Sequence, residues 1–464
     1  MNNILYKFFS VNTKELALLA YSFFFMFLLF ASYAILRPLR DALGLEGDTV
    51  DLKWLFLATF ILIILASLAA MWISSRLKRM FYINAIFIFF ISNLFIFYIA
   101  MQTISSDSVY FLWLCRSFYV WVSIFNLFII SSAWSLLADV FTKDFSKRMF
   151  AMIAAGASLG NIMGAYLVSV LAASITVDLF IFISILFLLF SLILKKLIIS
   201  EGFKFNDKVS FEDKFQKPIG SKNPFEGFKL IIKSKYLMAL LGFILLLTSV
   251  STFLYMEQAR MILDMFPTRE ARIQAFANID LIVQSLSFFI QIFLTAKIVQ
   301  FFGIKWLLSL LGFVLTVVFV IMALMHYGGL AEKPESSGGI YGGYGGYKEP
   351  IHRLFDSLVS EPETTYFYPI VLIIAMVIRR VGEYALVKPG REMLFVPLDS
   401  DSKYKVKNFL DTVVYRGGDA LSSQLEGALA KISIALTLFA GAFISFIWGL
   451  LGLFLSRSYE KNKY

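Results

Sequence analysis

Cysteine and histidine are nearly absent from this chain. Of its 464 residues, one is a cysteine, Cys115, and two are histidines, His326 and His352. A single thiol excludes an internal disulfide and any Cys-x-x-Cys metal site. With only two imidazoles beside it, no set of metal ligands is predicted. We therefore expect neither a metal nor another cofactor.

Charge is also scarce, and apolar residues dominate. Charged residues make up 16% of the chain and hydrophobic residues 59%. A soluble domain of this composition could not cover its surface with polar groups, whereas a protein surrounded by lipid does not need to. The expected surrounding is therefore a bilayer. The first apolar run, Leu16 to Leu36, is too long for a cleavable signal peptide and has no small-residue cleavage site, so we expect it to be a membrane span.

Apolar stretches of bilayer length recur along the chain. A spanning helix needs about 20 mostly apolar residues. Twelve candidate spans meet this requirement, six before a long polar stretch and six after it. They are 15–41, 54–75, 82–103, 109–138, 148–173, 177–199, 236–263, 276–301, 304–326, 366–388, 405–430 and 432–455.

The spans predict an all-α integral membrane protein built from two six-helix halves. The predicted parts are an N-terminal half (1–199), a cytoplasmic linker (200–235), a C-terminal half (236–456) with an external loop (327–365), and a cytoplasmic tail (457–464). Basic, tight turns recur at equivalent places, at Ser75-Arg-Leu-Lys-Arg79 after the second span and at Lys297 to Lys305 after the eighth. Such repetition is typical of parallel repeats of the major facilitator type.

The distribution of basic residues predicts the orientation. A net charge of +10 could indicate nucleic acid, but the lysines and arginines gather in loops on one side of the spans. Acidic or sparsely charged loops occupy the other side, as the positive-inside rule expects. Both termini are therefore predicted to be cytoplasmic, and no nucleic-acid partner is expected.

Ionisable residues inside the spans form the candidate site. An ionisable side chain at membrane depth costs at least ~2.5 kcal/mol, so it usually faces a partner or a polar cavity. The candidate substrate-binding residues are Arg37, Arg40, Asp41, Arg116, Glu257, Arg260, Arg379, Arg380, Glu383, Lys407, Asp411 and Arg416. One interpretation is that these charges only pair with one another, as Arg40–Asp41, Glu257–Arg260 and Arg380–Glu383, or reach the interface at helix ends. A surplus of arginine over acid instead favours an anionic solute, because the guanidinium fork binds carboxylate or phosphate with two hydrogen bonds.

One stretch matches a catalytic motif but lies in the wrong structural context for catalysis. Gly156-Ala-Ser-Leu-Gly160 matches the G-x-S-x-G pattern of hydrolases, but that motif requires a strand-to-helix turn and here falls inside an apolar helix. Glycines at 156, 160 and 164 instead predict close approach of two helices. We expect no enzyme activity.

Three stretches resemble the nucleotide transporter family, the ATP/ADP antiporters of the major facilitator superfamily. They are Tyr33-x-x-Leu-Arg-Pro-Leu-Arg-Asp41, Trp134-Ser-Leu-Leu-Ala-Asp139 with Gly156 to Gly160, and Tyr384-x3-Lys-Pro-Gly-Arg-Glu392 with the continuation to Asp419. The resemblance implies alternating access, exchange of one nucleotide for another, and substrate contacts at Arg37, Arg40, Asp41, Glu257, Arg260 and Lys407. In the first stretch this chain has Arg40 before the aspartate, where the antiporters of energy parasites have lysine.

The leading hypothesis is therefore a monomeric, multi-pass transporter of a bacterial inner membrane that exchanges ATP for ADP or related nucleotides. An alternative is a proton-coupled transporter of the same fold that carries another organic anion or an amphipathic substrate, with Glu257, Asp411 or Glu383 as the proton acceptor. An integral membrane enzyme acting on lipid-linked groups and a purely structural protein are further alternatives. The enzyme would need an acid, base or metal site at the lipid boundary. The structural protein would keep its role after every buried arginine had been neutralised.

Overall fold

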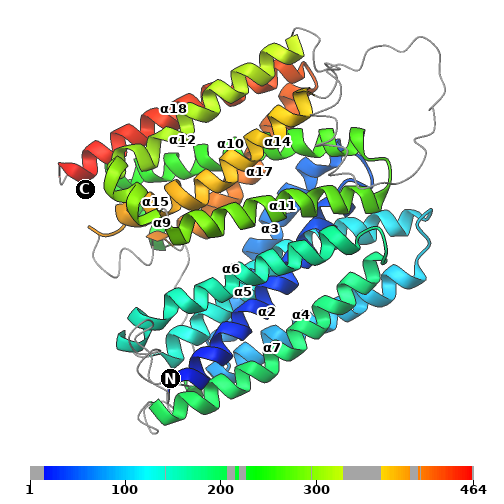
Figure 1. Ribbon diagram of the computed structural model, residues 1–464, viewed down its shortest axis with the longest axis vertical. Helices are drawn as coiled ribbons and strands as arrows, with labels where there is room; N and C mark the ends of the chain where they lie inside the picture. Colours follow the sequence, from blue (N-terminus) through cyan, green and yellow to red (C-terminus); the bar gives the residue numbers. More distant parts are fainter. Residues whose placement is uncertain are drawn as a thin grey trace. The chain divides into compact units, whose positions relative to one another are not determined.

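The protein is all-helical throughout the residues that the structure describes. The computed structural model describes residues 15–141, 143–205, 215–218, 226–293, 295–327, 367–397, 406–407 and 409–461 (Figure 1). Most of the predicted external loop 327–365, part of the linker 200–235, the end of the tail and His352 lie outside these residues. The helices of the first half are α2 (Leu16–Leu43), α3 (Thr49–Ser74), α4 (Arg79–Thr103), α5 (Val109–Val140), α6 (Lys143–Leu171) and α7 (Val177–Phe205).

The second half continues the pattern after a short helix, α9 (Glu226–Lys233). Its long helices are α10 (Lys235–Met265), α11 (Arg269–Phe293), α12 (Thr295–Tyr327) and α18 (Ile434–Glu460). Two further helical stretches consist of consecutive pieces. One contains α14 (Phe367–Gly382), the π-helical segment η3 (Glu383–Val387) and α15 (Lys388–Leu394), and the other contains the π-helical segment η4 (Leu410–Val414) and α17 (Tyr415–Ala430).

Ten helices among the described residues are long and apolar enough to cross a membrane. The tenth and eleventh predicted spans are not among these ten, although helix is present at both places. Both are divided by a π-helical segment and carry several charges, so neither provides a long, uniformly apolar helix. The fold class predicted from the sequence is confirmed, and these two spans are its irregular members.

The eighth span begins and ends earlier than predicted. It was expected at 276–301, whereas α11 covers Arg269–Phe293. The polar residues at its start hid the first turn from an apolar window. Arg272 is satisfied there, since its side chain donates to the carbonyl oxygens of Phe266 (2.8 Å) and Pro267 (3.1 Å). The chain then breaks at Gly303, whose φ of 64° and ψ of 173° are accessible to glycine and costly for other residues.

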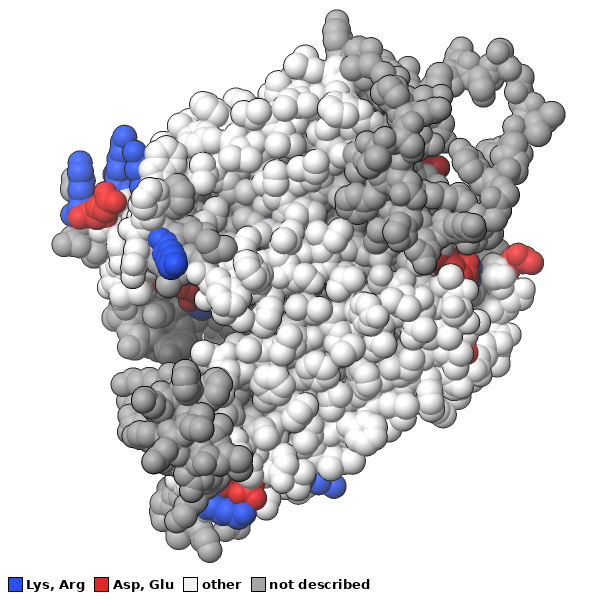
Figure 2. Space-filling model, in the orientation of Figure 1, with Lys and Arg blue, Asp and Glu red and all other residues white. Residues whose placement is uncertain are grey.

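The helices group into two compact units, which we describe separately. Unit 1 contains 1–47, 61–222 and 276–288; unit 2 contains 48–60, 223–275 and 289–464. In unit 1, α2 packs against α5, α6 and α7. In unit 2, α10 packs against α14, α17 and α18, and α12 packs against α18. On the face shown in Figure 2, the described charged side chains lie near helix ends and the surface over the helix middles is uncharged, as lipid tails require.

Glycines of α6 allow its close approach to α2, as the sequence predicted. A Cβ atom at Gly156 would lie 2.6 Å from the carbonyl oxygen of Phe23, and one at Gly160 would overlap the carbonyl of Phe27. One turn further, a Cβ at Gly164 would lie 2.5 Å from the carbonyl oxygen of Ala31. Small residues at helix interfaces permit this backbone contact, on which helix association in lipid depends.

Replacing Gly160 by alanine is expected to destabilise unit 1. The added methyl group meets backbone, which cannot rotate away, so overpacking should lower the free energy of unfolding by about 1–3 kcal/mol. Gly242→Ala is the matched control, because a Cβ there meets only the end of the flexible Leu451 side chain, at 3.3 Å. Unfolding of both purified variants in mixed micelles checks this, and equal stability of the two would contradict the packing described.

Candidate functional site

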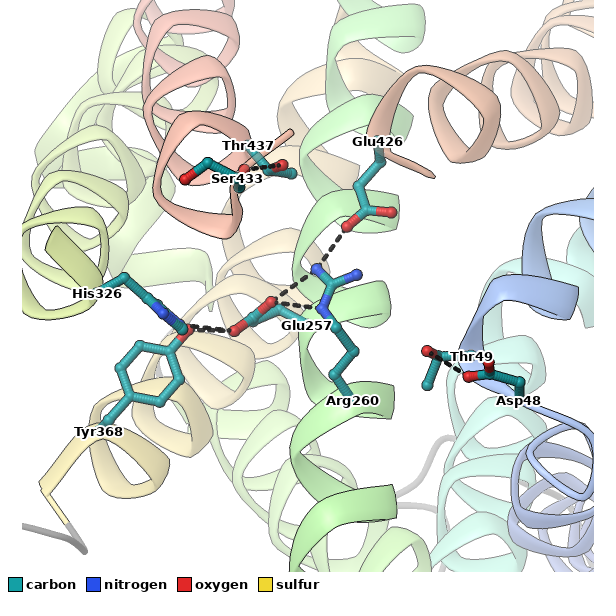
Figure 3. A network of polar contacts seen from close by, with 9 residues as sticks. All are labelled: Asp48, Thr49, Glu257, Arg260, His326, Tyr368, Glu426, Ser433 and Thr437. Atoms are coloured by element: carbon teal, nitrogen blue, oxygen red, sulfur yellow. Dashed lines mark hydrogen bonds and ion pairs between the residues drawn. The ribbon is translucent and has the colours of Figure 1, made fainter. Parts of the chain in front are cut away.

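A first charged cluster in unit 2 surrounds Arg260 (Figure 3). Its guanidinium donates two hydrogen bonds to Glu257 on its own helix, α10, at 2.9 and 2.7 Å, and one to Glu426 of α17 at 2.5 Å. The second carboxylate oxygen of Glu257 accepts a hydrogen bond from Tyr368 of α14 and lies 3.3 Å from His326 Nε2 of α12. We call these five residues the Arg260 cluster. Its ion triad joins α10 to α17, and the Glu257 carboxylate connects these two helices to α12 and α14.

A second cluster lies near the midpoint of α10. Ser251 is about 24 Å along this helix at a rise of 1.5 Å per residue. Its hydroxyl accepts a hydrogen bond of 2.5 Å from Arg379 of α14, which also pairs with Glu383 at 3.2 Å. The neighbouring Thr252 donates to Asp419 of α17 at 3.2 Å. The same carboxylate lies 3.7 Å from Arg416, three residues earlier on α17.

These residues form the Arg379 cluster, defined as Ser251, Thr252, Arg379, Glu383, Arg416 and Asp419. Its arginines are not fully enclosed, since the side chain of Arg379 is 11% exposed and that of Arg416 24%. A charged side chain near the middle of a spanning helix faces polar surroundings and not lipid. The π-helical segments η3 and η4 lie directly beside this cluster, and such interruptions of helical geometry are frequent at functional sites.

A third cluster lies at α15 and η4. Arg391 pairs with Asp411 at 3.2 Å, and Lys407 donates to both carboxylate oxygens of Glu392 at 2.7 Å. Lys388 also lies 3.9 Å from the ring centroid of Tyr384, a cation–π contact. The predicted site residues Lys407 and Asp411 therefore belong to this third cluster and not to the Arg379 cluster.

Unit 1 contains its own charged group. Arg40 donates to Asp41 through two nitrogens, at 2.9 and 2.6 Å, and stacks 5.3 Å from the ring centroid of Tyr119. Arg116 lies 5.1 Å from the ring centroid of Trp113. Arg37 lies 3.5 Å from Asp280, in the part of α11 that belongs to this unit. Arg380 of unit 2, also a predicted site residue, is buried at 4% exposure.

Sequence reasoning missed two of the acids that pair with predicted arginines. Asp280 and Glu426 were not counted among the membrane charges, although each lies within a predicted span. With them included, the arginine surplus is smaller than the sequence indicated. A systematic search of each span for every acid would have found both, but not their partners, which lie 166 residues or more away in the chain. Among the described residues, no group of three or more His, Cys, Asp or Glu side chains is placed to hold a metal ion.

Comparison with known proteins decides the family. The sequence model of the Major Facilitator Superfamily matches residues 16–328. This chain belongs to the Major Facilitator Superfamily. No curated protein sequence matches this facilitator. Membership of the superfamily makes this chain a multi-pass membrane transporter, and its charged clusters therefore lie inside a transport protein.

Solved transporters share the facilitator's fold at low sequence identity. A point mutant of the peptide transporter POT in complex with sulfate matches with a TM-score of 0.60 and 13% identity over 96% of this chain and 95% of that chain. A bacterial homologue of the human lysosomal transporter Spinster, inward-facing and unoccupied, matches with a TM-score of 0.53 and 14% identity over 98% and 99%. A point mutant of the nucleoside transporter NupG matches with a TM-score of 0.51 and 14% identity over 96% and 99%. These likenesses concern the fold, and the resemblance to nucleotide antiporters stays a prediction.

Proposed function

We propose that this facilitator is a secondary transporter that exchanges nucleotides, ATP for ADP or related ones, by alternating access across a bacterial inner membrane. The Arg379 cluster carries the proposal. It presents two partly exposed guanidinium groups near the middle of a spanning helix, where an unpaired charge is costly. An anionic substrate would share these donors with Glu383 and Asp419, because guanidinium groups bind phosphate oxygens with fixed, paired geometry.

The Arg260 cluster has a different role in this proposal. Arg260 already holds two carboxylates, Glu257 and Glu426, and Glu426 is fully buried. One arginine with two carboxylates carries a net negative charge, so a phosphate approaching Arg260 would be repelled by Glu257 and Glu426. We therefore assign substrate binding to Arg379 and Arg416 and give Arg260 a structural role.

Unit 1 supports the same proposal. Arg37 pairs with Asp280 and Arg40 with Asp41, and Arg116 of the same unit lies against the Trp113 ring. Arg37 is 22% exposed and its ion pair is long, at 3.5 Å, so the guanidinium can exchange its partner for a substrate anion. The motif around Arg37 is also one of those that resemble the nucleotide transporters.

Thermal stabilisation of the purified protein tests the proposal. ATP and ADP should raise the unfolding temperature, AMP should do so less, and adenosine should have no effect. At equal ligand concentration, a ligand that binds the folded state more tightly stabilises it more, and each phosphate adds contacts to arginine. Equal stabilisation by adenosine and ATP would place recognition on the base and overturn the assignment of the arginines.

A second candidate is proton-coupled transport of another organic anion. One observation favours it: the Glu257 carboxylate accepts a hydrogen bond from Tyr368 and lies 3.3 Å from His326 Nε2, so two groups able to carry a proton are in contact inside the transporter. Uptake by this mechanism would collapse with a protonophore and would not require a counter-substrate. Nucleotide exchange instead predicts uptake that survives the protonophore and requires a counter-substrate.

A further inference from the structure

Asp419 is an acid of the Arg379 cluster with unused capacity for hydrogen bonds. Among the described residues its carboxylate accepts one hydrogen bond, from Thr252 at 3.2 Å, and makes one loose ion pair, with Arg416 at 3.7 Å. An ionised carboxylate has about four acceptor positions. The side chain is 13% exposed, so part of this capacity faces the same polar surroundings as Arg416.

The backbone holds Asp419 close to α10. Gly418 presses against Thr248, since a Cβ at this glycine would overlap the threonine hydroxyl. One turn further, the hydroxyl of Ser422 donates to the hydroxyl of Ser249 at 2.8 Å. The contact between α10 and α17 is therefore a narrow seam of small polar residues, and the position of Asp419 is fixed by packing as well as by hydrogen bonding.

The hydroxyl protons of this seam are already in use. Ser249 donates to the carbonyl oxygen of Leu245 at 2.8 Å and Ser251 to that of Leu247 at 2.9 Å. Thr252 donates to Asp419, and Ser422 donates to Ser249. On the α17 side of this seam, the acceptor with capacity left for a ligand is the Asp419 carboxylate. It lies beside Arg416 of the same helix, and Arg379 binds the neighbouring Ser251.

A matching ligand carries donors beside an anionic group. Hydroxyl and ammonium groups could both donate to Asp419, but an ammonium would lie next to Arg416 and be repelled by it, whereas a neutral hydroxyl would not. We propose that Asp419 accepts hydrogen bonds from sugar hydroxyls of a phosphorylated substrate and thereby selects ribose over 2′-deoxyribose. This inference rests on the proposed nucleotide transport and adds a specificity residue to it.

The test compares ATP with 2′-deoxy-ATP as ligands of the purified full chain, with apparent affinities from thermal-stabilisation titrations. The wild type should bind ATP about tenfold or more tightly than 2′-deoxy-ATP, since a hydrogen bond to a charged acceptor is lost. In Asp419→Asn that ratio should fall toward one. Asp178→Asn, the same change at an exposed aspartate at the start of α7, should keep the wild-type ratio.

Thr252→Val provides a second variant if Asp419→Asn does not fold. It keeps the carboxylate but removes the hydrogen bond that orients it, so the ratio should again decrease. Equal binding of both nucleotides by the wild type, or an unchanged ratio in both variants, would overturn the role of Asp419 and leave nucleotide transport standing. If neither nucleotide stabilises the wild type, the proposed function itself fails, and this inference with it.

Discussion

Replacing Arg260 by leucine is expected to lower the free energy of unfolding by about 3 kcal/mol or more. The substitution leaves two carboxylates, Glu257 and Glu426, without their shared cation, and both are buried, at 4% and 0% exposure. Removing one partner of a buried ion group leaves an uncompensated charge and lowers stability strongly, whereas replacing the whole group by uncharged residues changes stability much less. Denaturant titration in mixed micelles measures the change directly.

Two further variants separate this explanation from simple loss of packing. Adding Glu257→Gln and Glu426→Gln to Arg260→Leu removes the stranded charges, so the triple variant should recover most of the lost stability. Lys204→Gln is the control, because its ion pair with Glu201 is exposed and contributes little. A triple variant as unstable as Arg260→Leu alone would contradict the ion triad as the cause.

Replacing Arg379 by lysine is expected to reduce the kcat/KM of substrate uptake by about ten- to a hundredfold, with little change in stability. Lysine keeps the positive charge that compensates Glu383 but loses the planar fork that binds two oxygens at once. The loss of one charge-assisted hydrogen bond to substrate corresponds to about 1.5–3 kcal/mol. Initial rates in proteoliposomes, at a series of substrate concentrations, give the value.

Arg76→Lys is the matched control, because Arg76 stacks on the exposed Trp72 outside all the charged clusters. It should transport like the wild type. If Arg379→Lys also transports like the wild type, the guanidinium geometry at mid-helix has no part in substrate binding, and the assignment of the Arg379 cluster is wrong.

The fold could be predicted because lipid makes simple demands on sequence. Each spanning helix must satisfy its own backbone and expose apolar side chains, so runs such as Leu16–Leu43 and Ile434–Glu460 are visible without any tertiary information. Prediction became less accurate where a helix satisfies polar groups through particular contacts. The start of α11 was missed because Arg272 caps the preceding turn, and η3 and η4 were missed because their π-helical geometry has no local sequence pattern that we recognise.

The candidate site was predictable only in its local part. Arg40 with Asp41 and Glu257 with Arg260 are neighbours along a helix, and the structure pairs them as spacing indicates. The partners that assign roles are distant in the chain. Glu426 turns Arg260 from a substrate ligand into the centre of an ion triad, and Thr252 and Ser251 place Asp419 and Arg379 in one cluster. Such pairings follow from the packing of α10 against α14 and α17, which no single segment specifies.

The central claim is that nucleotide is exchanged for nucleotide at a site built on arginine. The most direct measurement is uptake of labelled ATP into proteoliposomes that are either loaded with ADP or empty, with and without a protonophore. We predict rapid uptake into loaded vesicles, little uptake into empty ones, and no effect of the protonophore. Uptake that is equal in both vesicle preparations, or that collapses with the protonophore, would contradict exchange and favour proton-coupled transport.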